Sequence, residues 1–283
     1  MSPAHDKVAA ALEAPALSSR ARSRMRVRAV ARRHYLVMLR SPHRLFDVTV
    51  WPLVDVLLFG SIGAFVGRSD DVGAAAFGYL LAGIVLWHVI YQAQISVSTG
   101  FMEETWSRNL LNLMVTPIKE WEYVAGVALF GLVKLVLGVG LVAITALAAF
   151  SFDVTDFGMG LVPMAAILLV CGWIISMFVV GAVLRFGSGA EALAWGVLFV
   201  VLPVSGVFYP VEALPGLVQP LAMVLPTSHA FNAMRTLIDG GGIDWASVGI
   251  GAAGTLVLAL ASMFYLSRML ALFRKRGYIS RYS

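Results

Sequence analysis

Six long apolar stretches dominate the pattern of hydrophobic and polar positions along the 283-residue chain. Each holds about twenty or more residues with few charges, and a helix rising ~1.5 Å per residue needs this length to cross a ~30 Å hydrocarbon core. The stretches are Leu45–Val66, Phe77–Gly100, Tyr123–Phe150, Phe157–Leu184, Ala190–Tyr209 and Ala246–Ser267. This pattern predicts an all-α integral membrane protein with six transmembrane helices.

The basic residues lie almost entirely on one side of these predicted spans. If the chain crosses a membrane six times, both termini lie on the same side, and that side carries 18 of the 21 Lys and Arg residues. The other side keeps only Arg68 and Arg235, and Lys134 lies within a span. Because cytoplasmic loops of membrane proteins carry the excess of Lys and Arg, we expect both termini to be cytoplasmic.

The composition fits the same interpretation. Apolar residues make up 59% of the chain and charged residues 13%, against roughly 25% charged in an average globular domain. The net charge of +5 is explained by cytoplasmic basic anchors beside anionic lipid, so the lipid bilayer is an expected partner and nucleic acid is not. The single cysteine, Cys171, lies inside the fourth predicted span, so we expect neither a disulfide nor a metal site.

Four regions follow from this organisation. Residues 1–19 are rich in Ala, Pro and Ser and predict a disordered cytoplasmic tail. Residues 20–44 predict an amphipathic helix in the cytoplasmic interface, with an ordinary cytoplasmic anchor as the alternative. Residues 45–273 form the six-helix transmembrane domain, and residues 274–283 form a basic cytoplasmic tail.

The cytoplasmic connection after the second span carries a short amphipathic pattern at about residues 103–116. Its apolar positions recur at i, i+4, i+7 and i+8, which places them on one face of a helix; they are Trp106, Leu110, Leu113 and Met114. Polar groups beside this face include Glu103, Glu104 and Arg108. Since such a helix is tied to a span at each end, a push on it must move both spans.

The external connection between the fifth and sixth spans is too apolar for a solvated loop and too interrupted by proline for a span. Over about residues 210–227 it reads Pro-Val-Glu-Ala-Leu-Pro-Gly-Leu-Val-Gln-Pro-Leu-Ala-Met-Val-Leu-Pro-Thr. Broken backbone at membrane depth is tolerated where it is buried in protein or lines a cavity. We therefore predict a re-entrant helical hairpin that acts as an external gate. Its candidate gate residues are Tyr209, Pro210, Glu212 and Pro215.

Two segments in this order carry a resemblance. The stretch Glu-Glu-x-Trp-Ser-Arg-Asn-Leu-Leu-x-Leu-x-Val-Thr-Pro begins at Glu103, and Tyr-Pro-x-x-x-Leu-Pro begins at Tyr209. Together with the entry helix and six spans, they resemble the permease (transmembrane) subunit of a type-2 ABC exporter. The resemblance covers about residues 24–283.

The resemblance implies partners and a place in the cell. Glu103, Glu104, Trp106, Arg108, Leu110 and Leu113 would belong to a coupling helix that docks on a separate ABC ATPase subunit, present in two copies. Mg-ATP would bind there, and this chain would need no cofactor. A second permease chain, as a homodimer, would complete the substrate path in a bacterial plasma (inner) membrane. The substrate stays open among lipids, lipid-linked glycans and drugs.

Two charges lie deep in predicted spans. Asp55 and Lys134 are each about ten residues, or ~15 Å, from the cytoplasmic end of their span. A lone charge at such depth costs roughly 2.5–3.5 kcal/mol, so each needs a partner or water. Three roles stay open for this candidate pair: a polar contact in the substrate path, a pin between helices, or a Lys134 side chain that snorkels towards the interface.

The sequence also excludes some chemistry within this chain. None of its four lysines lies in the Gly-Lys-Ser/Thr context of a phosphate-binding loop, and no Ser-His constellation lies at membrane depth, so we expect no catalytic site. A secondary transporter without an ATPase is the alternative function. It would leave the cytoplasmic amphipathic segment without a role, and no repeat relates the two three-span halves.

Overall fold

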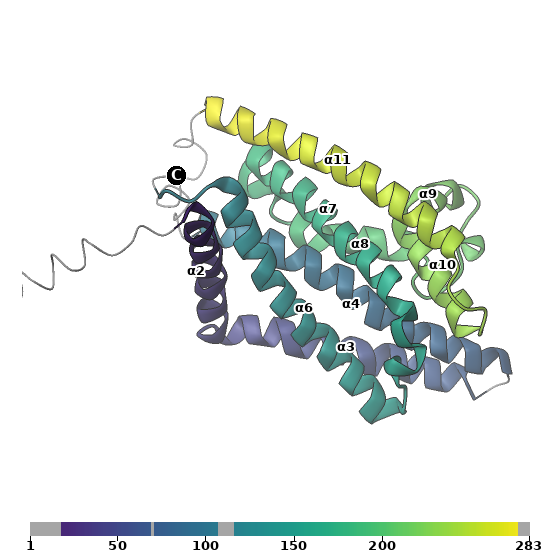
Figure 1. The fold of residues 1–283 in the computed structure, drawn as a ribbon. Coiled ribbons are helices and arrows are strands. Elements are labelled where there is room, and N and C mark those ends of the chain that lie inside the picture. The colour runs from purple at the N-terminus through teal and green to yellow at the C-terminus, as the bar shows by residue number, and fades with distance from the viewer. Residues whose placement is uncertain (1–17, 69–70, 107–115, 277–283) are drawn as a thin grey trace, which may run out of the picture.

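The computed structural model describes residues 18–68, 71–106 and 116–276, and every regular element among them is helical (Figure 1). The α-helices are α2 (Ser19–Leu39), α3 (Pro42–Val66), α4 (Asp71–Trp106), α6 (Glu120–Phe150), α7 (Val162–Phe186), α8 (Leu193–Val204), α9 (Gln219–Val224), α10 (Pro226–Ile238) and α11 (Trp245–Arg276). Three short 3-10 helices lie between them: η1 (Val154–Leu161), η2 (Gly187–Ala190) and η3 (Val211–Ala213). The predicted all-α class is confirmed for these residues.

Five of the described helical segments are long and apolar enough to cross a membrane. They are Val48–Val66, Ala75–Glu104, Trp121–Phe150, Val154–Ala190 and Trp245–Phe273. They correspond to five of the six predicted spans.

The predicted fifth span, Ala190–Tyr209, is shorter than expected. Its helix, α8, has 12 residues and is therefore ~18 Å long, which is less than a ~30 Å hydrocarbon core. Pro203 lies at its end, and Gly206 follows with a positive φ of 64°, a backbone conformation that glycine adopts without strain. The chain turns there instead of continuing to Tyr209, so the count of six spans stays a prediction.

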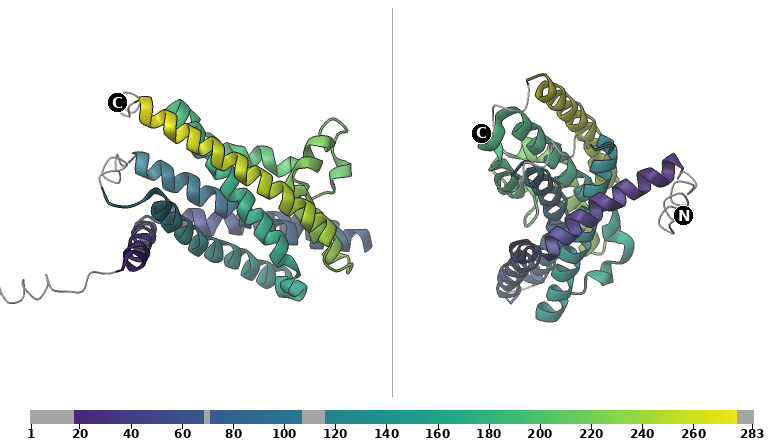
Figure 2. Two further views of the ribbon diagram at one scale, coloured as in Figure 1. Left: turned by 45° about the horizontal axis from the view of Figure 1, so that its top comes forward. Right: turned by 90° about the vertical axis from the view of Figure 1, so that its left-hand side faces the viewer.

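Helix α4 forms the centre of the bundle, and 83% of its most apolar stretch is buried. It packs against α3, α6, α7, α8 and α10, and Figure 2 shows α11 on the outside of α7. The largest apolar core of the described residues is built around α4 and includes Leu81, Ile84 and Ile90 together with Leu168 of α7 and Phe231 of α10. Whatever moves α4 must therefore move most of the bundle.

A glycine allows α4 and α7 to approach closely. A Cβ atom placed on Gly172 of α7 would lie 2.6 Å from both the Cβ of Ala93 and the carbonyl oxygen of Ile90 on α4. Small residues at helix crossings let backbones pack tightly, which is the main source of attraction between helices in lipid.

Helix α2 crosses one end of the bundle, remote from α9 and α10 (Figures 1 and 2). It begins at a cap in which the Ser18 hydroxyl accepts a hydrogen bond from the backbone N–H of Ala21. It packs on α6, where a Cβ on Gly126 would lie 2.6 Å from the Cβ of Val30. The predicted entry helix is thus present, and its position in a membrane interface stays a prediction.

The α4–α7 contact yields a stability prediction. Gly172→Ala forces a methyl group against the α4 backbone and should destabilise the fold by about 1–3 kcal/mol, the usual cost of overpacking. Gly196→Ala in α8 is the matched control, because nothing lies within 4 Å of the added Cβ and Ala favours helix by roughly 0.5–1 kcal/mol. Thermal unfolding in detergent should therefore show a lowered midpoint for Gly172→Ala alone; equal midpoints would contradict the close contact.

Candidate functional site

A bidentate ion pair ties α2 to the C-terminal end of α4. The Glu104 side chain is only 1% exposed, and its carboxylate accepts hydrogen bonds from Nη1 of Arg33 at 2.6 Å and from Nη2 at 3.1 Å. Nε2 of His34, the next residue of α2, lies 3.7 Å from the same carboxylate. Such paired Arg–carboxylate bonds are both strong and directional, so they fix the orientation of α2 against α4.

A second carboxylate ties α2 to the start of α6. Glu122 forms an ion pair with Arg26 at 3.2 Å and accepts a hydrogen bond from the Ser23 hydroxyl. It also accepts one from the backbone N–H of Lys119 at 2.9 Å, which caps the first turn of α6. We refer to Arg26, Arg33, Glu104 and Glu122 together as the α2 clamp.

The clamp changes the interpretation of Glu104. The resemblance implied that this carboxylate lies on a coupling helix and contacts an ATPase; the structure buries it against α2, and the ATPase contact stays a prediction. The difference arises because Arg33 lies 71 residues away in the chain, so no local pattern indicates the pair. Two further residues, Arg26 and Glu122, were missed for the same reason.

The rest of the predicted coupling segment is only partly described. Glu103–Trp106 continue α4 instead of beginning a separate helix, because Met102 is buried against Val179 and Val183 of α7 and so extends the packed part of α4. Arg108, Leu110 and Leu113 lie outside the described residues.

Trp106 is the last residue of α4, and its side chain is exposed. Its side chain is 52% exposed, its ring stacks on Trp195 of α8 at 6.4 Å between centroids, and its Nε1–H donates to Glu191 at 2.9 Å. Glu103, three residues earlier, lines a cavity that is described next.

Two adjoining cavities lie beside α3, α4 and α8. The first, here called the aromatic hollow, has a volume of about 350 Å³. Its lining includes Trp51, Phe59, Trp87, Tyr91, Trp195, Phe199 and Phe208, and Asp55 is its acidic residue. The second, here called the cytoplasmic hollow after the predicted topology, has a volume of about 290 Å³ and is lined by Glu103, Trp106, Lys134, Ser96 and Thr99 among others. Trp51, Ile95 and Trp195 line both, so the two hollows adjoin along α4.

Asp55 and Lys134, the two charges deep in the predicted spans, line different hollows. Asp55 of α3 lines the aromatic hollow, and its Oδ2 lies 3.5 Å from Nε2 of His88 on α4. The other ring nitrogen of His88 is hydrogen-bonded to the carbonyl oxygen of Ile84 at 3.0 Å, which fixes the ring. Lys134 of α6 is buried and lines the cytoplasmic hollow. Coupling between Asp55 and Lys134 stays a prediction, and the sequence did not indicate His88 as a neighbour of Asp55.

Helix α4 also carries a row of buried amides and hydroxyls between these cavities and α7. Gln94 donates hydrogen bonds to the carbonyl oxygen of Ala194 at 3.0 Å and to the Ser98 hydroxyl at 3.1 Å. Its own backbone carbonyl accepts a bond from the Ser176 hydroxyl of α7 at 2.8 Å. The bonds to Ala194 and Ser176 join α4 to the first turn of α8 and to α7.

The turn after α8 is anchored from two sides. Arg235 of α10 is buried and donates a hydrogen bond to the carbonyl oxygen of Gly206 at 2.6 Å. On the other side, a Cβ on Gly83 of α4 would lie 2.8 Å from the carbonyl oxygen of Val207. The hydroxyl of Tyr209 donates to the carbonyl oxygen of Pro203 at 2.7 Å. The beginning of the predicted gate is therefore held firmly against α4 and α10.

The remainder of the predicted gate is less buried within the single chain. Pro210 precedes η3, while Glu212 and Pro215 are exposed. Leu217 is 97% exposed, and Leu221 and Val224 are exposed as well. Instead of two half-helices the segment forms one 3-10 turn and the six-residue helix α9, because its closely spaced prolines each remove a backbone donor.

A comparison with protein families gives one clear match. The model for the ABC-2 type transporter matches residues 25–238, which is well over half of the chain. The matched region begins in α2 and ends with α10, so it includes the α2 clamp, both hollows and the turn after α8. No curated protein sequence matches the chain significantly.

The α2 clamp yields a second prediction. Arg33→Gln leaves the Glu104 carboxylate buried without its partner, and Glu104→Gln removes that charge. In a double-mutant cycle on thermal stability in detergent, the two changes should be non-additive by about 0.5–3 kcal/mol. Arg32→Gln, at an exposed neighbouring position of α2, is the control and should be additive with Glu104→Gln. Additivity in both cycles would show that the ion pair contributes nothing to holding α2.

Proposed function

Because the chain belongs to the ABC-2 type transporter family, and is thus a membrane subunit of an ABC transporter, we propose that it is the permease of an ATP-driven exporter. In this proposal two copies of the chain enclose the substrate path, and two copies of a separate ATPase subunit drive it. Mg-ATP binds to the ATPase, and the permease supplies the path and the mechanical link. Both termini lie in the cytoplasm at a bacterial plasma membrane.

The proposed substrate path is supported by the pair of hollows beside α3, α4 and α8. A carboxylate such as Asp55 is costly in contact with lipid, so residues of this kind face a bundle interior or a water-filled cavity. In the single chain, however, the aromatic hollow lies beside exposed apolar side chains of α3 and α8, among them Leu58 and Phe199, the latter 78% exposed. A second copy packed on this face covers both the carboxylate and the apolar surface.

The lining suits amphipathic molecules. Aromatic side chains offer large apolar contact area, while Asp55 at one end and Lys134 and Glu103 at the other supply polar contacts. A lipid, a lipid-linked glycan or an amphipathic drug presents both kinds of surface. The proposed substrate therefore belongs to one of these three classes.

The coupling follows from the central position of α4. An ATPase that pushes on the segment at about residues 103–116 acts directly on the end of α4, at Trp106. Through Glu104 and Arg33 the same push reaches α2, and through the stacked rings of Trp106 and Trp195 it reaches α8. Rigid-body shifts of packed helices are a common way to switch a transport path between two openings.

The turn after α8 suits a gate at the other end. It is anchored on α10 by Arg235, which holds the Gly206 carbonyl, and it leads into the exposed apolar residues of α9. In a dimer these residues would meet the second copy above the hollow. Glu212 would then lie at the outer rim of the path.

The proposed coupling is tested by replacing its apolar anchors. Leu110→Asp with Leu113→Asp should reduce the amount of ATPase that co-purifies with the permease by at least tenfold, since each change would place an unpaired charge in the apolar part of the interface. Leu217→Asp in the exposed external segment is the control and should leave co-purification unchanged. Both variants should elute as folded protein on size exclusion. If the double variant retains the ATPase at the level of the control, the coupling segment lies elsewhere.

A further inference from the structure

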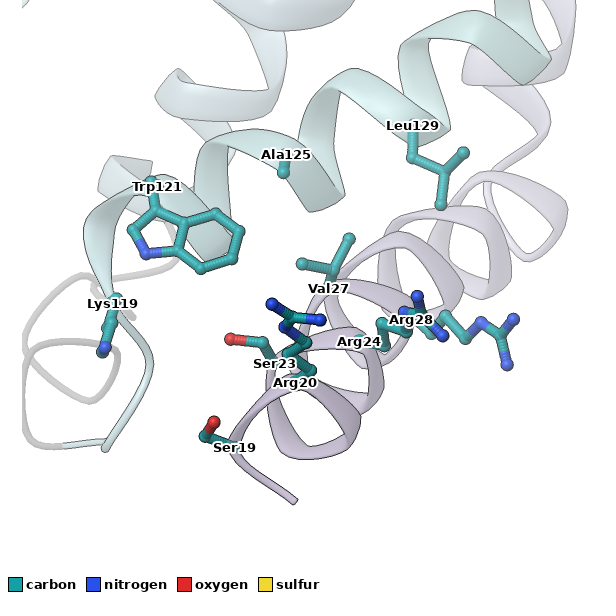
Figure 3. A pocket seen from close by; sticks show the side chains of 10 residues that line it. All are labelled: Ser19, Arg20, Ser23, Arg24, Val27, Arg28, Lys119, Trp121, Ala125 and Leu129. Atoms are coloured by element: carbon teal, nitrogen blue, oxygen red, sulfur yellow. The ribbon is translucent and has the colours of Figure 1, made fainter. Parts of the chain in front are cut away.

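A third cavity lies between the first half of α2 and the start of α6, on the cytoplasmic end of the bundle by the predicted topology (Figure 3). Its volume is about 580 Å³, larger than either hollow of the path. Figure 3 shows that α2 supplies its basic side and α6 supplies Trp121, Ala125 and Leu129. It shares no lining residue with the aromatic or cytoplasmic hollow.

The basic side is built by helical spacing. Arg20, Arg24 and Arg28 follow one another at i, i+4 and i+8 and so lie on one face of α2. All three are exposed, and none forms an ion pair with another residue of the described part of the chain. Lys119, which precedes α6, adds a fourth positive charge to the lining. Among the described side chains that line it, the cavity thus gathers four cations and no carboxylate.

This gathering contrasts with the neighbouring arginines of the same helix. Arg26 and Arg33 face the bundle and are neutralised by Glu122 and Glu104. Like charges at i and i+4 repel one another and destabilise a helix. An anion bound along the row Arg20, Arg24 and Arg28 would offset this repulsion.

The opposite wall of the cavity is apolar. It consists of Val27, Trp121, Ala125 and Leu129. Trp121 begins the apolar segment Trp121–Phe150, and both Trp121 and Leu129 are exposed. A tryptophan at the end of a span marks the level of lipid head groups, so the cavity opens from head-group level along the side of α6 towards the acyl chains.

We propose that this cavity binds an anionic phospholipid. Guanidinium groups of Arg20, Arg24 and Arg28 would bind the phosphate oxygens, a pairing for which the planar, multiply donating guanidinium is well suited. Trp121 would cover the glycerol region, and Leu129 would contact the first part of an acyl chain. Basic pockets between membrane helices are known to hold anionic head groups. The lipid would fasten the outer side of α2 to α6, as the α2 clamp fastens its inner side, and this site does not depend on the proposed function.

The test uses the full-length protein in phosphatidylcholine nanodiscs, with phosphatidylglycerol added and the bound lipid counted by native mass spectrometry. The pocket variant carries Arg20→Gln, Arg24→Gln and Arg28→Gln. The matched control carries Arg22→Gln, Arg32→Gln and Arg40→Gln, which remove the same charge from two exposed positions of α2 and from the exposed residue that caps its end, none of which lines the cavity. A parallel arm replaces phosphatidylglycerol with inorganic phosphate.

The pocket variant should bind phosphatidylglycerol about a hundredfold more weakly, because it loses the direct hydrogen bonds from three guanidinium groups to the phosphate, and such charge-assisted bonds are stronger than neutral ones. The control should lose much less. Leu129→Gln, which keeps every charge, should also weaken phosphatidylglycerol binding while leaving the fold intact. Equal losses in both arginine variants would show diffuse attraction and overturn the site. Displacement of the lipid by millimolar inorganic phosphate would overturn the lipid assignment, since a free anion would then suffice.

Discussion

A polar group inside a bilayer has no water to bond with, and this constraint organises the whole chain. Each unsatisfied group costs several kcal/mol in hydrocarbon, so a hydrogen bond from a buried polar side chain to another helix is a strong attachment. Gln94 and Ser176 form such bonds and join α4 to α7 and α8, while Gln92 and the Ser96 hydroxyl of α4 have no hydrogen-bond partner among the described residues. The bonds of Gln94 and Ser176 therefore attach neighbouring helices to the central one, as the proposed transmission of a force along α4 requires.

The same constraint operates at the C-terminal end of α4, where Glu104 is buried. Removing a carboxylate from water is costly unless it is paired in good geometry, and Arg33 provides the bidentate pairing at 2.6 and 3.1 Å. The outcome is that α2, which belongs to no span, is fixed to both α4 and α6. A cytoplasmic partner that moves the end of α4 would therefore move α2 as well, and a phospholipid in the basic cavity would hold the far side of α2 in place.

The sequence was sufficient to predict those features that depend on local length and periodicity. The five long helices, α2 and the all-helical class follow from apolar stretches and caps, because a segment that must cross hydrocarbon has few alternatives to a helix. The predicted length of the fifth span was wrong. Helix α8 is shorter, and the turn after it is held by Arg235, which lies 29 residues after Gly206 in the chain. The sequence did not indicate the contacts of Glu104 and His88, because their partners Arg33 and Asp55 lie on other helices. The Asp55 position could be recognised as special from its depth, whereas the aromatic cavity around it could not.

The most direct test of the account asks whether the face of α3 and α8 that borders the aromatic hollow meets a second copy of the chain. In a Cys171→Ser background, which removes the single native cysteine, one cysteine is introduced by Phe199→Cys on α8. The matched control is Leu260→Cys on α11, an equally apolar exposed position on the side of the bundle remote from α3 (Figure 1). A short bis-maleimide added to membranes should convert the Phe199 variant to a covalent dimer and leave the Leu260 variant monomeric. A monomer at Phe199, or equal dimer yields at both positions, would contradict a path enclosed between two copies at this face.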